Sequence, residues 1–474
     1  MSSEQLFSPY DSGKVWKMCL TASLGSFIFG YNLGVFTSIH DPVASTLDWG
    51  SDKDTWITVM SAIMPFGAMI SAVFSGPISN RIGRRRTLML SNFVTLVGAG
   101  IIVIPFTVTF GIGRFITGIG AGSYAALVPL YINETSPTEI SGKTGAMVQF
   151  QITLGIVVAY LLALVLPTGD YDSDPLTYWW MGMFALQGPI AMLQFFLFFW
   201  AYKLETPTWF WSKNFREDAL ESLRQVYSEE SAQEALKRLD SAQNQDKELT
   251  SSFISEAGND PSYMELLLCK QGTGKLMRLG WANNFFQQFS GINAILAYST
   301  TIFGHLGGGT FMSRVYTVIV GTVNMVSALA VIPLVDKLGR KILLVLGCIG
   351  MGGCLFLSGL FSGPLSSWSI AFPMISILLY IIFFEGTIGP ICWIYCGEIM
   401  NPRGMSICTA VNWFCVTIVI FTFPPLKDLL GISVVFWCYA GICAVGVLYF
   451  WLDMLETRGL NKQEIQKLFM KKSS

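Results

Sequence analysis

Amide side chains interrupt several long apolar stretches of this sequence. An amide both donates and accepts hydrogen bonds, so in apolar surroundings it can either hold a polar ligand or bridge two helices. For a single residue the bridge is an adequate explanation, and it is worth on the order of 0.6 kcal/mol. Gln287, Gln288 and Asn293 lie close together beside the helix-loosening Gly291, and this grouping favours ligand binding. Further amides in such stretches include Gln149, Asn324 and Asn412.

The sequence holds little material for catalysis or metal binding. We find no nucleophile elbow, phosphate-binding loop or metal-ligand spacing. The chain has two histidines, His40 and His305, which is too few for a histidine-based metal site or proton relay. We therefore predict a protein that is not an enzyme and that uses no cofactor and no metal.

The composition indicates which elements must position these amides. Of the 474 residues, 13% are charged and 52% are hydrophobic, whereas a soluble protein has about a quarter charged residues. Apolar runs long enough to cross roughly 30 Å of hydrocarbon, about 20 residues each, recur along the chain. We predict twelve transmembrane helices in the lipid bilayer, at 16–39, 55–79, 87–107, 109–133, 145–166, 181–201, 276–303, 313–335, 342–361, 370–397, 405–424 and 431–451.

Charge sets the expected orientation and excludes one class of partner. Lys and Arg gather at alternate loops, while the other loops hold little beyond Lys53, Arg314 and Lys427. By the positive-inside rule both termini face the cytoplasm. The net charge of -1 leaves no extended basic face to neutralise phosphates, so we expect no nucleic-acid partner. The sequence makes no prediction of the oligomeric state.

The chain divides into two related halves. The one long hydrophilic stretch, with amphipathic helical spacing, separates six predicted spans from six. RIGRRRTLML after the second span corresponds to KLGRKILLVL after the eighth, and YINETSPTEISG after the fourth to YCGEIMNPRGMS after the tenth. Such a repeat is typical of transporters that rock two bundles about a central site. We predict an N-terminal bundle at 1–202, a cytoplasmic linker at 203–275, a C-terminal bundle at 276–455 and a cytoplasmic tail at 456–474.

A set of short motifs resembles one known family. They are FGYNLGV at 29–35, NRIGRRR at 80–86, GRFITGIGAG at 113–122, ETSPTEISG at 134–142, QQFSGINA at 287–294, DKLGRK at 336–341, FFEGTIGPICW at 383–393, NW at 412–413 and LETRG at 455–459. In this order they resemble the sugar porters of the major facilitator superfamily, the family of the facilitative glucose transporters, over nearly the whole chain. The resemblance implies an all-α membrane protein whose twelve helices form two pseudo-symmetric six-helix bundles. The sequence departs from the family pattern at Ser141, Thr208 and Leu455 and in the segment around Arg403. These differences concern gating and not the fold.

The resemblance implies that these amides bind a sugar. A hexose has hydroxyls that suit amides and an apolar C–H face that suits an aromatic ring. The positions that match sugar contacts of the family are Gln149, Gln287, Gln288, Asn293, Asn324, Phe384, Trp393 and Asn412.

A second set of residues matches the cytoplasmic gate of the family. Basic residues at the ends of spans stand opposite acids in each half, in an arrangement that would tie helices together. The residues concerned are Arg84, Arg85, Glu134, Arg340, Lys341 and Glu398.

The resemblance predicts facilitative transport of a hexose such as glucose by alternating access, in the plasma membrane. Asn32 stands where related proton symporters carry an aspartate, so Arg114 lacks the titrating partner it can have there. Glu385, a carboxylate near the middle of a span, keeps a proton-coupled symporter as an alternative, because intramembrane acids are functional candidates. A non-transporting sugar sensor is a second alternative. Glucose, fructose and mixed selectivity all stay open.

Overall fold

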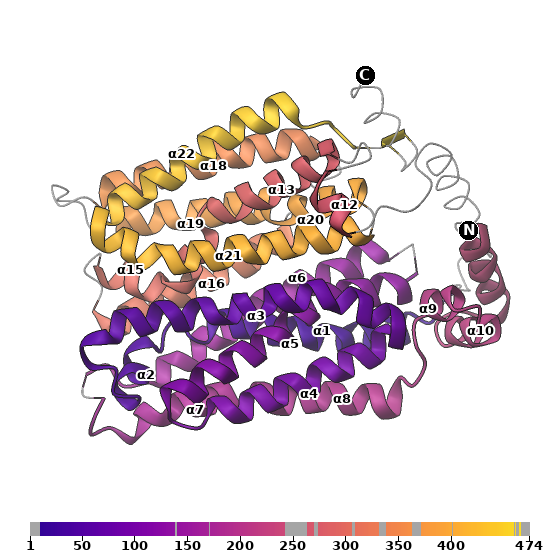
Figure 1. Cartoon of the computed structure of the whole chain (residues 1–474), viewed down its shortest axis with the longest axis horizontal. Helices are drawn as coiled ribbons and strands as arrows, with labels where there is room; N and C mark the ends of the chain where they lie inside the picture. Colours follow the sequence, from indigo (N-terminus) through magenta and orange to yellow (C-terminus); the bar gives the residue numbers. More distant parts are fainter. Residues whose placement is uncertain are drawn as a thin grey trace, which may run out of the picture.

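Helices that run side by side make up the described part of the chain (Figure 1). The computed structural model describes residues 10–137, 140–169, 171–241, 263–269, 274–305, 309–330, 338–362, 371–400, 402–458, 460 and 464–465. Most of the predicted tail, part of the linker and the last residues of the predicted eighth span lie outside these ranges.

The first half supplies one group of packed helices. The long ones contact each other in the pairs α1–α6, α3–α5 and α4–α5. Their bounds are α1 (Ser12–Gly34), α3 (Lys53–Ile82), α4 (Arg84–Ile102), α5 (Thr107–Thr135), α6 (Ser141–Leu162), α7 (Trp179–Ala185) and α8 (Gln187–Phe196), with the short elements α2 (His40–Thr46), η2 (Gly50–Asp52), η3 (Ala163–Val165), η4 (Pro175–Tyr178) and the π-helix η5 (Leu197–Ala201).

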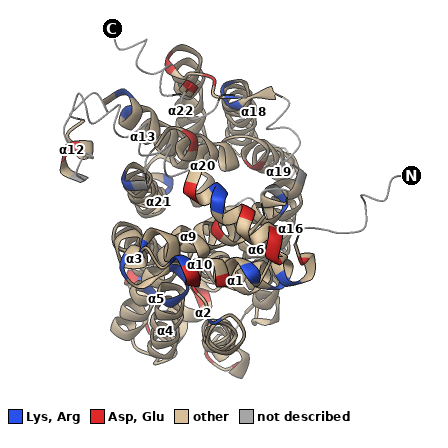
Figure 2. Ribbon diagram, turned by 90° about the vertical axis from the view of Figure 1, so that its right-hand side faces the viewer, with Lys and Arg blue, Asp and Glu red and all other residues tan. Residues whose placement is uncertain are grey.

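The second half repeats the pattern beside the first. Figure 2 looks along the helices and shows α1, α3, α4, α5 and α6 below α13, α18, α19, α20, α21 and α22. The bounds are α13 (Gly274–Phe289), α14 (Ile292–Ala297), α15 (Ser299–His305), α16 (Thr310–Ala330), α18 (Arg340–Phe361), α19 (Ala371–Gly386), α20 (Ile388–Ile399), α21 (Pro402–Leu430) and α22 (Ile432–Asp453).

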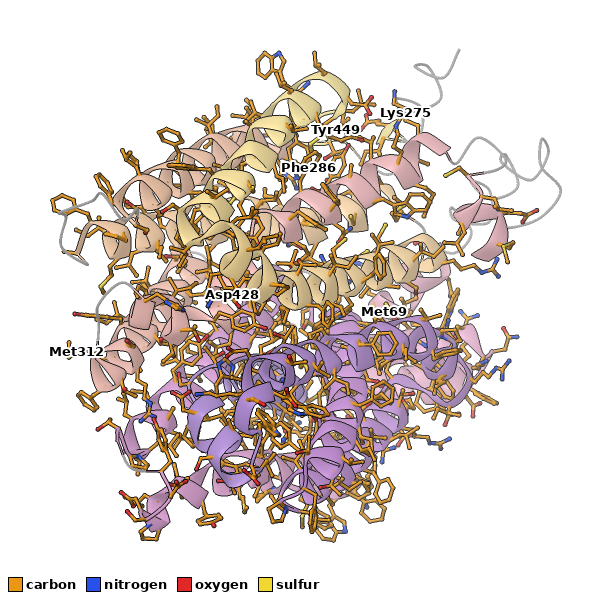
Figure 3. All side chains as sticks on the ribbon, turned by 60° about the vertical axis from the view of Figure 1, so that its left-hand side comes forward. Met69, Lys275, Phe286, Met312, Asp428 and Tyr449 are labelled. Carbon is orange, nitrogen blue, oxygen red and sulfur yellow. The ribbon has the colours of Figure 1, made fainter. Side chains whose placement is uncertain are left out.

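The linker forms short helices at one end of the molecule. They are α9 (Pro207–Ser212), α10 (Arg216–Arg224), a further helix at 229–241, and α12 (Tyr263–Leu267). We call this end, which also carries the first residues of α4 and α18, the linker end. The end that carries α2 and the start of α16 is the far end (Figure 1). Figure 3 shows Lys275 toward the linker end and Met312 at the opposite edge.

Nine helical segments among the described residues are long and apolar enough to cross a membrane. Of the other three predicted spans, the first and third are α1 and α4, and the seventh is divided into α13, α14 and α15. Large apolar side chains such as Phe93, Val108 and Leu448 face outward. Outward apolar surface and inward polar groups are what a bilayer requires, so the chain is a multi-pass membrane protein.

Two spans predicted as continuous helices are broken in their middle. The seventh breaks at Gly291, whose φ of 94° is left-handed and whose missing Cβ leaves room for the ring of Tyr439. The tenth breaks at Thr387, between α19 and α20. Broken helices inside a membrane free backbone groups and redirect side chains, and such sites commonly line the binding site of a transporter.

Glycines let α1 and α6 approach at backbone distance. A Cβ at Gly30 would lie 1.8 Å from the carbonyl oxygen of Ile152, and one at Gly155 would lie 2.3 Å from the carbonyl oxygen of Phe27. Small residues are typical of helix interfaces in membranes, because close backbone packing supplies much of the association energy there.

We predict that Gly30→Ala destabilises the protein, because the obstructing atom is backbone and cannot rotate away. The cost should reach or exceed the roughly 1–3 kcal/mol of an overpacked core. The measurement is the unfolding temperature of the purified protein in detergent. Gly100→Ala on α4 is the matched control, since nothing lies within 4 Å of its added Cβ, and it should be neutral or slightly stabilising. Equal unfolding temperatures for the two variants would contradict this packing.

Candidate functional site

Four of the predicted amides form one hydrogen-bonded network in the second half. Gln288 on α13 donates Nε2 to Gln287 Oε1 and to Asn412 Oδ1 on α21, each at 3.1 Å. Asn412 donates back to Gln287 Oε1 at 2.6 Å, and Asn293 on α14 donates to Gln288. The side chains of Gln287, Gln288 and Asn412 are all buried. Amides that satisfy one another can exchange those bonds for the hydroxyls of a ligand without leaving a buried group unpaired.

The network extends to Asn284, and the neighbouring Asn283 bonds to the backbone of α20. Asn412 Nδ2 donates to Asn284 Oδ1 at 2.9 Å, and Asn283 Nδ2 donates to the carbonyl oxygen of Cys392 at 3.1 Å. Asn283 and Asn284 precede Gln287 and Gln288 by one helical turn, so the i, i+4 spacing was a signal that they share the same faces of α13.

A buried carboxylate connects the two groups of helices at mid-depth. Glu385 on α19 accepts a hydrogen bond from Asn324 on α16 at 3.0 Å and a longer one, at 3.4 Å, from Gln149 on α6. Gln149 is the predicted site residue of the first half, and this contact brings it to the second. The three polar side chains therefore stand together, apart from the amide network on α13 and α21.

The two predicted aromatic residues differ in exposure. Phe384 is buried, with its ring 6.5 Å from that of Tyr380 and its edge against Gly389. Trp393 on α20 is 36% exposed. Of the two rings, the indole offers the more accessible apolar surface.

Each half carries one arginine–glutamate pair at the linker end. Arg84 donates Nε and Nη2 to the carboxylate of Glu134 at 2.9 to 3.1 Å, and both side chains are about nine-tenths buried. Arg340 donates to Glu398 at 2.7 Å in the same manner. Each pair joins two helices of one half, α4 to α5 and α18 to α20. A bidentate, largely buried pair of this kind is costly to break from one side.

Two further glutamates cap the helices that begin with these arginines. Glu205 accepts hydrogen bonds from the backbone amides of Arg85 and Arg86, each at 2.9 Å, and burial raises the pKa of its carboxyl. Glu456 accepts those of Arg340 and Lys341 at 2.9 and 3.0 Å. A carboxylate at a helix N-terminus satisfies amides that have no partner inside the helix.

A repeated tripeptide in the sequence marks both caps. The tripeptide Leu-Glu-Thr occurs at 204–206 and again at 455–457, once after each half. The hydroxyls of Thr206 and Thr457 also donate to the paired carboxylates of Glu134 and Glu398.

The other two predicted gate residues use their side chains differently. Arg85 Nε donates to the carbonyl oxygen of Phe198 at 3.0 Å, and the Lys341 ammonium lies 5.7 Å from the ring centre of Trp451. Both contribute backbone amides to the glutamate caps. Their side chains hold α4 and α18 to neighbouring helices of the same half.

Asn32 and Arg114 line one small cavity whose walls come from both halves. Asn32 on α1 donates Nδ2 to Gln187 Oε1 at 2.6 Å, and Arg114 on α5 donates Nε to the carbonyl oxygen of Met60 at 3.2 Å. The Arg114 guanidinium also lies over the rings of Phe36 and Phe184.

The two halves are joined by hydrogen bonds at the far end. Arg314 on α16 is 1% exposed, and it donates Nη1 to the carbonyl oxygen of Leu166 at 2.6 Å and Nη2 to that of Pro167 at 3.1 Å. Ser38 and Thr300 share a hydrogen bond of 2.9 Å between their hydroxyls. The far end is therefore closed in this structure.

Two groups of membrane helices packed side by side, with polar residues between them, are the architecture of the major facilitator fold. The fold matches the proton:xylose symporter XylE bound to 6-bromo-6-deoxy-D-glucose, with a TM-score of 0.79, 26% identity, and coverage of 97% of this chain and 100% of that one. It also matches an inward-open XylE from E. coli, with a TM-score of 0.77, 26% identity, and coverage of 96% and 99%.

The chain belongs to the Sugar (and other) transporter family, which matches residues 18–469. This family is the one that the motifs predicted, that of the sugar porters.

Several curated relatives are similar over almost the whole chain. The glucose transporter GlcP of Staphylococcus epidermidis is 30% identical over 461 residues, which is 94% of this chain and 95% of the relative. A facilitated trehalose transporter Tret1-2 homolog of Drosophila simulans is 30% identical over 95% of this chain and 90% of the relative. The chain spans about half the length of the facilitated trehalose transporter Tret1 of Drosophila yakuba, to which it is 31% identical.

We predict that Arg314→Met opens the far end. Methionine keeps much of the length but loses the charged hydrogen bonds to Leu166 and Pro167, which are worth roughly 1.5–3 kcal/mol when the donor is ionised. A cysteine placed at Ala297 on α14 should then react with a thiol reagent in detergent about tenfold faster or more.

The matched control is Arg278→Met, since Arg278 is exposed and pairs with Asp453 within the second half. Arg278→Met should leave the labelling rate of the cysteine at position 297 unchanged. The labelling of the native cysteines, measured in the parent protein without that cysteine, is subtracted first. Equal rates in the Arg314 variant and its parent would show that this arginine does not hold the far end closed.

Proposed function

We propose that this protein is a facilitative carrier that moves a hexose such as glucose across the plasma membrane by alternating access. The observation that carries the proposal is the network of Gln287, Gln288, Asn293 and Asn412, whose amide groups pair with one another. Relatives named as carriers of glucose, trehalose and xylose support a sugar as the substrate.

The proposed sugar lies between the amide network and the Gln149–Glu385–Asn324 group. Hydroxyls on one side of the ring would bond the amides of α13, α14 and α21, and hydroxyls on the other would meet the amides of Gln149 and Asn324. Trp393 would cover the apolar face, with Phe384 behind it. A few such bonds and one stacking contact suffice for millimolar affinity, which corresponds to roughly -4 kcal/mol, and weak binding allows release.

The proposed orientation places the linker end in the cytoplasm. The bundles would be residues 1–202 and 276–455, with the linker at 203–275 and the tail at 456–474. The Arg84–Glu134 and Arg340–Glu398 pairs, together with Arg85 and Lys341, would then hold the cytoplasmic ends of each bundle rigid. The far end would open to the exterior when the contacts of Arg314 separate.

The second candidate is proton-coupled transport, and Glu385 is the observation that favours it. Its carboxylate is buried and receives two amide hydrogen bonds, and no cation within 4 Å pairs with it among the described residues. Facilitated transport remains our proposal because the position beside Arg114 is Asn32, an amide that carries no proton during the cycle.

We predict that Gln288→Leu weakens sugar binding while the protein still folds. The substitution keeps the volume but removes both donor and acceptor, so hydroxyls of the bound sugar would be buried without partners. The sugar concentration at half-maximal uptake should rise about fivefold or more. The measurement is uptake by purified protein in liposomes, with glucose, fructose, trehalose and xylose as competitors.

Gln151→Leu is the matched control. Gln151 lies on α6 near Gln149, it is equally buried, and its amide makes a hydrogen bond of 3.5 Å to Ser23, away from the network. The sugar concentration at half-maximal uptake should not change in this variant. If Gln288→Leu behaved like Gln151→Leu, the sugar would bind elsewhere.

We also predict that transport is downhill. Sugar exchange in liposomes should proceed without a pH gradient, and an imposed gradient should not drive accumulation. A protonophore should leave the initial rate of uptake intact, since no titrating group faces Arg114 from position 32. Accumulation that collapses with the proton gradient, and that is lost in Glu385→Gln, would replace the facilitator with the symporter.

A further inference from the structure

The Arg114 guanidinium is a buried cation with no ion pair among the described residues. The side chain is 3% exposed, and its partners are the Met60 carbonyl oxygen and the rings of Phe36 and Phe184, at 4.9 and 5.7 Å from the guanidinium carbon. Its Nη1 is buried and makes no hydrogen bond within the described residues. Arginine keeps its charge in proteins, and an uncompensated buried charge is strongly unfavourable. The site therefore lacks a negative charge.

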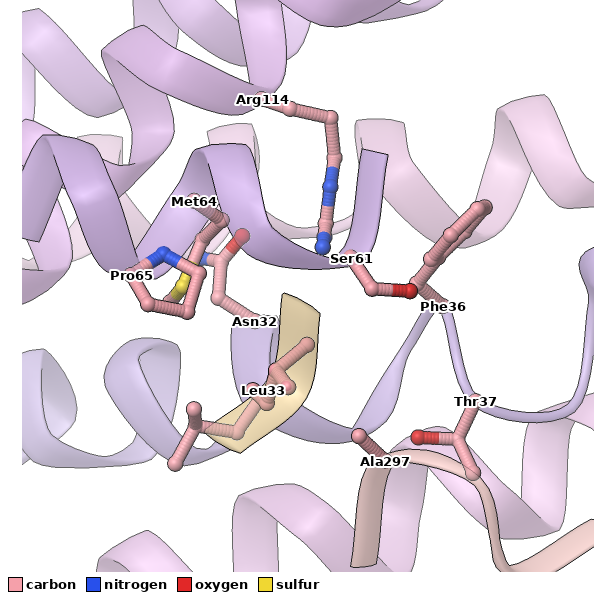
Figure 4. A pocket seen from close by; sticks show the side chains of 10 residues that line it. Asn32, Leu33, Phe36, Thr37, Ser61, Met64, Pro65, Arg114 and Ala297 are labelled. Atoms are coloured by element: carbon pink, nitrogen blue, oxygen red, sulfur yellow. The ribbon is translucent and has the colours of Figure 1, made fainter. Parts of the chain in front are cut away.

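A cavity of about 20 Å³ lies beside this cation. Figure 4 shows the guanidinium entering it from α5, with Ser61 next to it and Asn32 and Thr37 on the adjoining walls. The volume exceeds the roughly 10–15 Å³ that holds one water molecule, so the space takes one or two small particles.

The walls of the cavity carry unused hydrogen-bonding groups. Ser61 Oγ and Thr37 Oγ1 are buried and make no hydrogen bond in the described residues. The phenols of Tyr298 and Tyr160 approach these two hydroxyls without reaching hydrogen-bond geometry. Both hydroxyls are therefore available to donate into the cavity.

Rotation of two amides adds a further donor. Asn32 Oδ1 and Gln187 Nε2 are both buried without a partner, while Asn32 Nδ2 donates to Gln187 Oε1. If both amides turn by 180°, Gln187 Nε2 donates to Asn32 Oδ1, and Asn32 Nδ2 faces the cavity. The turn gives up the 3.1 Å bond from Asn32 to the Ile28 carbonyl oxygen and leaves Gln187 Oε1 unpaired where Nε2 was, so the hydrogen bond from Asn32 Nδ2 to a ligand in the cavity must compensate for that loss.

We propose that this cavity binds one small monovalent anion, a halide such as chloride. The anion would accept hydrogen bonds from Arg114, Ser61, Thr37 and the rotated amide of Asn32, and it would neutralise the guanidinium. Chloride fits because it is monatomic and close to water in size. The cavity is completed by Ala297 and Ile420 of the second half, so the anion site is intact only while the far end is closed. Halide binding therefore stabilises the far-end-closed state.

The experiment measures the unfolding temperature of the purified full-length protein in detergent, in sodium chloride mixed with sodium gluconate at constant ionic strength. Because a ligand that binds the folded state stabilises it, the temperature should rise with chloride and level off, by about 2 °C or more. Bromide should act like chloride. A flat response to both halides would mean that water fills the cavity, and it would overturn the proposal.

Three variants locate the effect. Ser61→Ala removes one donor and should raise the half-maximal chloride concentration about fivefold. Asn32→Asp places a carboxylate beside Arg114, which takes over the neutralising role of the anion. The unfolding temperature of this variant should therefore no longer depend on chloride. Ser91→Ala is the control, since Ser91 is buried on α4 and donates to the Thr87 carbonyl oxygen, outside the cavity. A chloride response that survives in Asn32→Asp and is unaltered in Ser61→Ala would place the anion elsewhere.

Discussion

Hydrocarbon supplies no hydrogen-bond partner, so every polar group inside this protein must find one within the protein or on its ligand. The amides of α13, α14 and α21 meet this requirement by bonding one another. A network of this kind is stable without sugar, yet each of its bonds can be replaced by a hydroxyl of similar chemistry. The same requirement explains why the broken helices at Gly291 and Thr387 lie in the protein interior, where side chains and neighbouring backbone can satisfy freed groups.

The two ends of the molecule use different chemistry. At the linker end, arginine–glutamate pairs join helices of the same half, and the caps from Glu205 and Glu456 bind the segment after each half to the helix that begins with those arginines. Gly83 and Gly339, with φ of 104° and 85°, permit this approach, since a Cβ at either would lie within 3 Å of the capping carboxylate. Each half is thereby made rigid at this end.

At the far end the halves are joined by an arginine that donates to backbone carbonyls and by a pair of hydroxyls. When such contacts separate, the carbonyls and hydroxyls can bond water, and no carboxylate is left without a counter-charge. Contacts of this kind are better suited to repeated opening than buried ion pairs, for which separation is costly. The arrangement is consistent with rigid halves that move against each other.

The sequence by itself determined the membrane location, the twofold repeat, the family and the types of side chain near the centre. These follow from composition, hydropathy and motifs, all of which are local. It also placed Arg84 and Arg85 opposite Glu134, and Arg340 and Lys341 opposite Glu398, because the two halves carry the same motifs in the same order, but it did not say which of these residues pair. The tertiary structure decided what depends on contacts between distant segments. It divided the seventh and tenth spans, brought Asn284 into the amide network, turned the side chains of Arg85 and Lys341 away from the acids and placed Glu385 between Gln149 and Asn324. It also left Arg114 beside a cavity without a counter-charge, because a charge balance is a property of all the helices that surround a side chain and not of the helix that carries it.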